Sequence, residues 1–416
     1  MLVVAAAAPG QLATTTFGPR PDDPAINYRG PVSDPVARLT ARLADGEAGL
    51  EYRGPLGYLE SVLDGLDIPI ESQLAVFSRN SLQNRHISPS NPRMLFFTDD
   101  VVVAGIQGAP LIEIAAVDPL RGVVFYTLEQ SRGFFGRPGF VREGRRCLQC
   151  HDSLNSLGVP GMLVRSVMPS PDGTANPQLG NHVIDHRSRL EDRWGGYYVT
   201  GRHPDVAHLG NGTVTDIRDE TSIRDNQELT LDSITAHIDS GTTLTDTSDI
   251  VALMVFEHQM HMTNLLVRYG WEVRYAMAGG EEGAGSGVDL SAAAREVVDY
   301  MLFVDEADLP GPIEGGSGFR RAFESRGPFD SRGRSLRQLD LDRRLMRYPL
   351  SYMIDSNAFD GMPVEARNAL YFRLWQILSG RDADPRYGRL SAADRGAILD
   401  ILRETNPALP AYFAAR

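Results

Sequence analysis

The feature of this chain that most restricts its fold is a change of hydrophobic pattern along its length. Between residues 73 and 130, short runs rich in β-branched and aromatic residues follow one another, separated by turn-forming sequences such as Gly108-Ala109-Pro110. The runs cover residues 74–77, 94–97, 101–106, 111–117 and 123–128. Such runs, joined by short turns, predict strands of an antiparallel meander.

The second half of the chain is predicted to be helical from about residue 232. Its main helix is expected over residues 249–277, with Ser248 as N-cap. Further helices are expected over residues 292–303, 363–378 and 392–402, the last capped by Ser391 and Asp394. Residues 308–340, rich in Gly, Pro and Arg, read as a long surface loop. Two short helices are expected between residues 34 and 66, and further strands over residues 162–167 and 196–200.

These patterns predict an α+β fold, in which a strand-rich, antiparallel N-terminal half precedes a mainly helical C-terminal half. We expect a leader over residues 1–34, a strand-rich region over 35–215 and a helical region over 216–416. Residues 1–8, MLVVAAAA, are similar to the apolar core and small-residue end of a secretory signal, although no Lys or Arg precedes them. A disordered, alanine-rich terminus is the alternative interpretation.

Charge and hydropathy exclude two classes of partner. The 41 basic and 54 acidic residues give a net charge of −13, which repels nucleic-acid phosphates and anionic lipid surfaces. A membrane-spanning helix needs roughly 20 apolar residues, and the apolar runs here are much shorter. We therefore expect neither nucleic-acid binding nor a membrane span.

The chain has two cysteines, and they form one motif with the next residue: Cys147-Leu148-Gln149-Cys150-His151. The CxxCH spacing is typical of covalent haem attachment, with two thioether bonds from the cysteines and the histidine as iron ligand. A disulfide would close a very small loop, and a zinc site would need further ligands. A thiol redox pair uses the same CxxC spacing and stays open as the rival interpretation.

The motif resembles the haem segment of c-type cytochromes, and the following Gly158-Val159-Pro160-Gly161 is similar to their Gly-Pro segment. The resemblance implies one covalent haem c. It also makes the carbonyl of Pro160 a candidate partner for Nδ1 of His151; alternatively, Pro160 only turns the chain. It covers residues 147–161 only. The remaining chain is too long for a small carrier and resembles the large bacterial single-haem cytochromes. Haem attachment in bacteria takes place outside the cytoplasm, so the resemblance implies an exported, periplasmic protein.

The sixth iron position is the main open question at the level of sequence. His258, on the long predicted helix with His261 three residues later, is the best candidate ligand, and hydrogen bonding within the core is the alternative. Other candidate ligands are His186, His203, His208, Met162, Met168, Met260 and Met262. Candidate contacts to the haem are Arg145 and Arg146 for its propionates, and Trp194, Tyr197 and Tyr198 for its pocket wall.

Three functions follow from these expectations. The first is electron transfer through one haem, with a redox partner protein or a small-molecule donor or acceptor. The second is a peroxidase-like oxidoreductase with an open or displaceable sixth position, in which Glu257, His258 and His261 act as acid and base groups. The third is a haem-based sensor, for which the sequence offers no positive indication.

Overall fold

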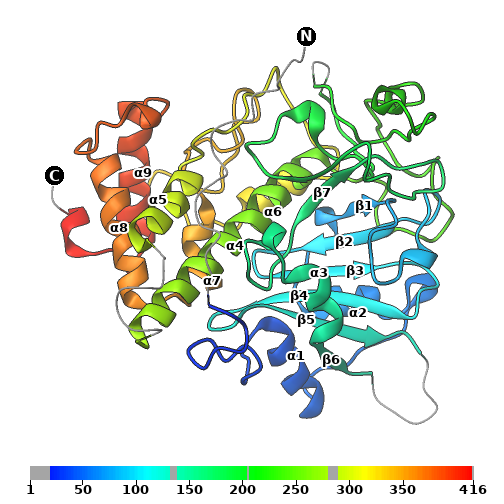
Figure 1. Cartoon of the computed structure of the whole chain (residues 1–416), viewed down its shortest axis with the longest axis horizontal. Coiled ribbons are helices and arrows are strands. Elements are labelled where there is room, and N and C mark those ends of the chain that lie inside the picture. The colour runs from blue at the N-terminus through cyan, green and yellow to red at the C-terminus, as the bar shows by residue number, and fades with distance from the viewer. Residues whose placement is uncertain (1–18, 132–137, 204–205, 280–288, 415–416) are drawn as a thin grey trace.

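The computed structural model describes residues 19–131, 138–203, 206–279 and 289–414. The predicted α+β architecture is confirmed: an antiparallel six-stranded sheet forms the N-terminal half, and helices dominate the C-terminal half (Figure 1). The signal-like residues 1–8 lie outside the described residues. Within the described ranges, no helix is long and apolar enough to cross a membrane.

The main sheet is a meander in which each strand pairs with the next. Its order is β1-β2-β3-β4-β5-β6, and every pairing is antiparallel. The strands are β1 (Leu74–Val76), β2 (Arg93–Phe97), β3 (Val101–Gly105), β4 (Leu111–Asp118), β5 (Gly122–Glu129) and β6 (Phe140–Glu143). The first five confirm the predicted runs. Strand β6 was not predicted because its four residues, FVRE, carry no apolar run.

Both faces of this sheet are covered, which explains why its strands are almost continuously apolar. Helices α1 (Pro35–Ala44) and α2 (Leu59–Gly65), the two short helices expected, share a buried cluster with one face. Helix α4 (Ile250–Met277) shares a cluster with the other face. The α4-side cluster contains the sheet residues Leu95, Phe97, Val102, Ala104, Ala115, Val117, Val123 and Phe125.

A second, two-stranded sheet pairs β7 (Val164–Val167) with β8 (Asn181–Ile184). Strand β7 confirms the run predicted over residues 162–167. The strand predicted over residues 196–200 is wrong: that segment makes only isolated bridges, such as Val76 with Tyr197. Left-handed backbone angles at Trp194 and Gly196, with φ of 66° and 89°, bend the chain there and prevent a regular strand.

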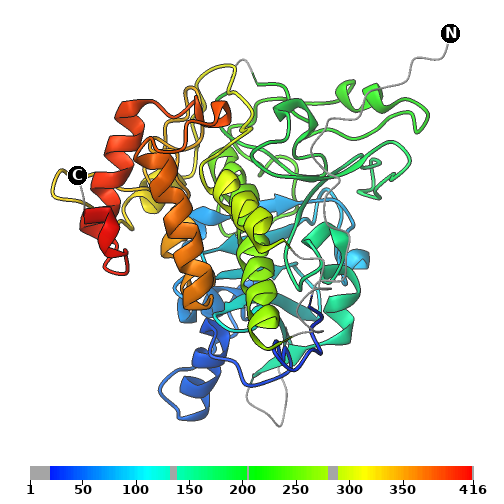
Figure 2. The ribbon, with the colours of Figure 1, turned by 60° about the vertical axis from the view of Figure 1, so that its left-hand side comes forward.

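The long helix α4 and the helices beyond it form the other side of the molecule. They are α5 (Leu290–Met301), α8 (Val364–Leu378) and α9 (Ala392–Thr405), and they follow one another outward from α4 (Figures 1 and 2). Shorter helices are α3 (Arg145–His151), α6 (Phe319–Glu324) and α7 (Asn357–Asp360). The predicted capping box of Ser391 and Asp394 is confirmed.

The predicted N-cap of α4 is wrong by one residue. The carboxylate of Asp249 accepts from the backbone N–H groups of Val251 and Ala252, so Asp249 is the cap. The hydroxyl of Ser248 instead accepts from the N–H of Ala75, 2.9 Å away, and joins the helix start to the sheet. Residues 232–249 are not helical, so the helical part begins later than expected.

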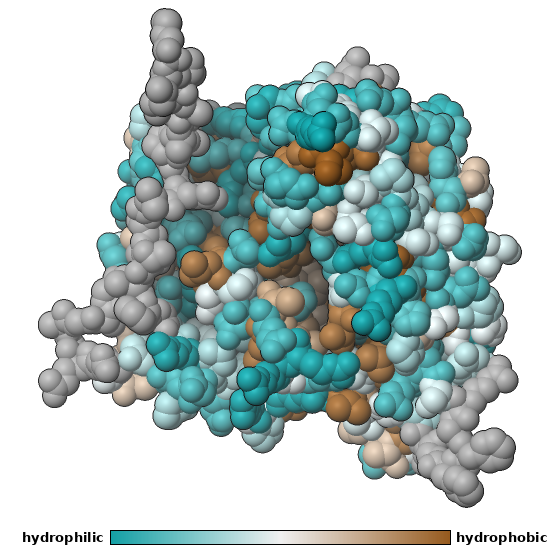
Figure 3. All heavy atoms as spheres, turned by 45° about the vertical axis from the view of Figure 1, so that its right-hand side comes forward, coloured by the Kyte–Doolittle hydropathy of each residue, from teal (hydrophilic) through white to brown (hydrophobic). Residues whose placement is uncertain are grey.

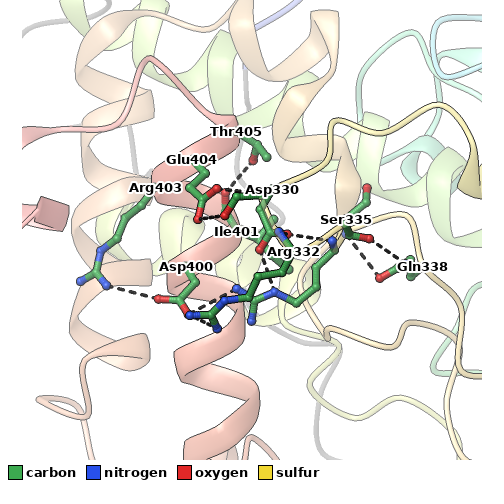
Figure 4. A network of polar contacts seen from close by, with 12 residues as sticks. Asp330, Arg332, Ser335, Gln338, Asp400, Ile401, Arg403, Glu404 and Thr405 are labelled. Carbon is green, nitrogen blue, oxygen red and sulfur yellow. Dashed lines mark hydrogen bonds and ion pairs between the residues drawn. The ribbon is translucent and has the colours of Figure 1, made fainter.

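Residues 308–340 form a long connection, interrupted by the short helix α6, but the prediction of a surface loop is wrong in part, because Leu309, Ile313, Phe319, Phe323, Leu336 and Leu339 are buried in the α4-side cluster. Its later part is fastened to α9 by charged contacts (Figure 4). The Arg334 guanidinium lies 2.7 Å from the Asp330 carboxylate and 3.3 Å from that of Asp400. The carboxylate of Glu404 accepts from the N–H of Ser331 at 2.7 Å.

The described part of the predicted leader, residues 19–34, is packed against the sheet rather than extended. Ile26 and Tyr28 are buried, and the Tyr28 hydroxyl donates to the carbonyl of Val123 at 2.8 Å. The large α4-side cluster also contains side chains from both the predicted strand-rich and helical regions. Packing therefore joins these parts of the chain around common cores.

A buried ion pair lies in the N-terminal third of α4. Glu257 is fully buried and pairs with Arg193, while the indole N–H of Trp194 donates to its other carboxylate oxygen at 3.0 Å. Arg193 also donates to the carbonyls of Ser188 and His186. All these groups are out of water, so each depends on the others for hydrogen bonding.

Replacement of Arg193 by Met is therefore expected to lower the free energy of unfolding by about 3–5 kcal/mol, because it leaves a buried carboxylate without its cation. Urea unfolding followed by circular dichroism measures this. Arg332→Ala, which removes an exposed partner of Asp400, is the control and should cost less than about 1 kcal/mol. If both variants lost the same amount of unfolding free energy, the stabilising role of the buried Arg193–Glu257 pair would be contradicted.

Candidate functional site

The CxxCH motif forms the short helix α3, which directly follows the edge strand β6. Cys147 is half-buried against the α4-side core, and Cys150 is exposed; both are free thiols. His151 is the last residue of the helix. The motif therefore presents two thiols and an imidazole from consecutive turns of one helix beside the sheet.

After α3 the chain turns back on itself and returns to His151. Leu157 and Gly158 both adopt left-handed conformations, with φ of 63° and 73°, which reverse the chain. Pro160 then bridges to Asp152, and the N–H of Gly161 donates to the carbonyl of His151 at 2.8 Å. This closed loop places the carbonyl of Gly161 beside the imidazole.

The ring of His151 has one nitrogen in a defined hydrogen bond. Its Nδ1 lies 2.9 Å from the carbonyl oxygen of Gly161. A carbonyl can only accept, so Nδ1 carries the proton and Nε2 keeps its lone pair. Burial lowers the pKa of His151, which favours the neutral ring. A neutral imidazole with a free Nε2 lone pair is the form that binds a metal.

This geometry corrects one residue of the expected site. Pro160 was the candidate partner for Nδ1, but the carbonyl that reaches the ring belongs to Gly161, one residue later. Pro160 instead takes the other role that the sequence left open and shapes the turn. The physical reason is the loop closure, in which Gly161 meets His151 through both its N–H and its C=O.

Phe125 and a set of polar side chains form the wall behind His151. The rings of Phe125 and His151 lie 4.7 Å apart between centroids. Since side chains alternate along a strand and directly paired residues share a face, Glu113 and Thr127 point to the same side of the sheet as Phe125. Arg93 lies 3.7 Å from Glu113 on that side. Figure 3 turns the sheet side of Figure 1 forward and shows that this face of the molecule is hollowed, with apolar residues along part of the hollow.

Two arginines near His151 were not among the expected site residues. Arg93 on β2 and Arg165 on β7 both lie close enough to contribute to the lowered pKa of His151. Each is partly buried, and Arg165 donates to the side chain of Asn181. Being partly buried near His151, they are better placed to hold a carboxylate group than Arg145 and Arg146, which are exposed. Arg146 faces Glu143 at 3.5 Å.

The three aromatic residues proposed for the pocket wall do not share one wall in the structure. Tyr197 is buried on the α4 side, and burial raises its pKa to about 12, although the nearby Arg93 acts in the opposite direction. Tyr198 belongs to the cluster on the opposite face, with its ring 4.9 Å from that of Phe77. Trp194 belongs to the buried ion-pair network of Glu257. Of the three, only Tyr197 lies near the arginines of the site.

His258, the expected sixth ligand, lies in the core with both ring nitrogens in hydrogen bonds. Its Nδ1 is 2.8 Å from Nδ1 of His186, and its Nε2 is 2.8 Å from the hydroxyl of Ser351. His258 is fully buried. Iron ligation by His258 would require this network to break, so the geometry favours the alternative of a hydrogen-bonded core histidine.

Of the other candidate ligands, His186, His203, His208, Met168, Met260 and Met262 are buried, whereas His261 and Met162 are half-buried. His261 faces Asp185 and Arg187. His203 and His208 pack against each other with centroids 4.9 Å apart. Among the described residues, no group of three or more His, Cys, Asp or Glu side chains is arranged to hold a bare metal ion. A haem iron needs only one or two protein ligands.

Comparisons with known proteins identify no significant relative of this chain. No family model matches the chain, and neither a curated protein nor a solved structure shows a significant match.

The surroundings of Cys147 bear on the rival thiol role. Burial, with Glu143 and Glu113 nearby, raises the pKa of the Cys147 thiol to about 11. Redox-active thiols have the opposite property, a lowered pKa that maintains a thiolate at neutral pH. The structure therefore gives Cys147 a protonated, weakly nucleophilic sulfur.

In reduced protein without haem, Cys147 should react slowly with iodoacetamide at pH 7.5, because only the thiolate is nucleophilic. Its rate should rise about tenfold per pH unit up to about pH 10. Peptide mass spectrometry measures labelling, with exposed Cys150 as the comparison in the same sample. Labelling of Cys147 that is fast and independent of pH near neutrality would support a thiol redox role.

Proposed function

We propose that this chain is an exported c-type haem protein that transfers electrons through one covalently bound haem c. Cys147 and Cys150 would supply the thioether sulfurs, and His151 would supply a nitrogen ligand for the iron. When bound, the haem supplies one-electron chemistry at its iron. The observation that carries the proposal is the hydrogen bond from Nδ1 of His151 to Gly161, which leaves Nε2 available in the correct tautomer.

The residues around the motif fit such a group. A haem combines a flat apolar ring with two carboxylates. Near His151, Phe125 offers an apolar surface, and Arg93 and Arg165 supply positive charge. The carboxylate of Glu113 is held by Arg93 and by the hydroxyl of Ser81 at 3.2 Å, so it does not stand as an unpaired charge in the site.

Electron transfer requires a partner, and the proposal leaves two kinds open: a redox protein or a small-molecule donor or acceptor. The net charge of −13 favours a partner surface with positive charge. Export is part of the proposal because haem is attached to CxxCH outside the bacterial cytoplasm, and it agrees with the signal-like residues 1–8.

The test is expression together with the haem-attachment machinery. Wild-type protein should retain its haem absorption after denaturation and organic extraction. Cys147→Ser and Cys150→Ser should each retain one thioether at most, and the double variant should lose all covalent haem. Arg145→Ala, which changes an exposed residue of the same helix, is the control and should retain the haem. Absence of covalent haem in the wild type would refute the proposal.

A second candidate function is an oxidoreductase with an open or displaceable sixth position. One observation favours it: His258 has no ring nitrogen free for iron as it stands. A five-coordinate iron admits small ligands, whereas a six-coordinate iron excludes them.

Absorption spectra of the reduced protein with and without carbon monoxide separate these functions. An unchanged spectrum is expected for an electron carrier, and a shifted band would support the oxidoreductase. In His258→Phe, we expect the wild-type response, because the hydrogen bonds of His258 keep it in the core. A carbon monoxide response that appears only in this variant would show that His258 is the ligand after all.

A further inference from the structure

We propose that Asn264 of α4 is a positioning residue for His151, acting through the peptide unit between Gly161 and Met162. This inference rests on the proposed function, since it concerns the residue that would bind iron. Asn264 does not contact the imidazole itself. It holds the backbone group that does.

The key geometry lies in one peptide plane. The carbonyl oxygen of Gly161 accepts from Nδ1 of His151 at 2.9 Å. The N–H of Met162 belongs to the same peptide unit and donates to Oδ1 of Asn264 at 3.2 Å. Because a trans peptide is planar and its C=O and N–H point in opposite directions, fixing one direction fixes the other.

A second hydrogen bond from the same side chain makes the contact rigid. Nδ2 of Asn264 donates to the carbonyl of Met162 at 2.6 Å. Met162 is thus bound through both its backbone N–H and its C=O, as in a strand pairing. Asn264 is 2% exposed and sits in the middle of α4, whose long apolar surface packs on the sheet. The clamp is therefore anchored to the most buried helix.

The absence of a side chain at Gly161 allows this approach. A Cβ added at Gly161 would lie 2.2 Å from Oδ1 of Asn264, well inside van der Waals contact. The positions of Gly161 and Asn264 therefore depend on each other, and a larger residue at 161 would displace either the asparagine or the backbone that carries the carbonyl.

The hydrogen bonds also form a chain with an electronic consequence. The amide oxygen of Asn264 polarises the peptide unit, which makes the Gly161 carbonyl a stronger acceptor for Nδ1–H. A stronger hydrogen bond at Nδ1 increases the basicity of Nε2 as a ligand. A more basic nitrogen ligand would stabilise ferric iron over ferrous iron. Asn264 should therefore make the reduction potential of a bound haem more negative.

The first test measures the reduction potential of haem-loaded protein. Asn264→Leu should shift it to a more positive value, because the peptide unit loses its acceptor. Gln259→Leu is the matched control: it removes another buried amide of α4, which bonds to Thr98 and Tyr352 instead, and should leave the potential unchanged.

The outcomes separate the two proposals. Absence of covalent haem in the wild type refutes the proposed function. Haem present with the same potential in Asn264→Leu and Gln259→Leu refutes the positioning role alone. If Asn264→Leu does not accumulate, Asn264→Ser gives the same comparison, because its side chain is too short to hold both backbone groups of Met162.

The second test needs no haem. Gly161→Ala should lower the urea midpoint of unfolding in the wild-type background and lower it much less in the Asn264→Ala background, where the clash is removed. Such coupling in a double-mutant cycle supports the close contact. Additive effects would contradict it.

Discussion

The hydrogen bond between His151 and the carbonyl of Gly161 is the contact on which the site depends. It sets the tautomer of the imidazole and so decides which nitrogen is available to a metal. A seven-residue helix could not hold a histidine in one orientation by itself. The return loop through Gly158, the ring of Phe125 and the clamp of Asn264 supply what the helix lacks.

The sheet explains why such a loop can be held firmly. Its strands are buried on both faces, so its position relative to α4 is determined by two apolar layers. On the α4 side, however, the apolar surface gives way to Arg93 of β2 and Glu113 of β4. A rigid apolar frame that ends in paired charges, beside a histidine with a free lone pair, is suited to a ligand with both apolar and acidic parts.

Much of this fold was predictable from local patterns, because strands β1 to β5 and helices α4, α8 and α9 have strong apolar periods. Strands β6 and β8 were missed because their sequences are short and polar, and their pairing comes from tertiary contacts. The motif of Cys147, Cys150 and His151 was visible at once from spacing. Two charged residues, Arg93 directly before one apolar run and Glu113 inside another, were a signal that could have been used. Asn264 could not be predicted, because its contact with Met162 crosses 102 residues of sequence.

The most direct test of the central claim is the mass of the tryptic peptide covering residues 147–165, taken from protein matured with the haem-attachment machinery. The account predicts that this peptide carries one haem bound through both cysteines. A peptide of unmodified mass, or one with a disulfide between Cys147 and Cys150, would contradict it.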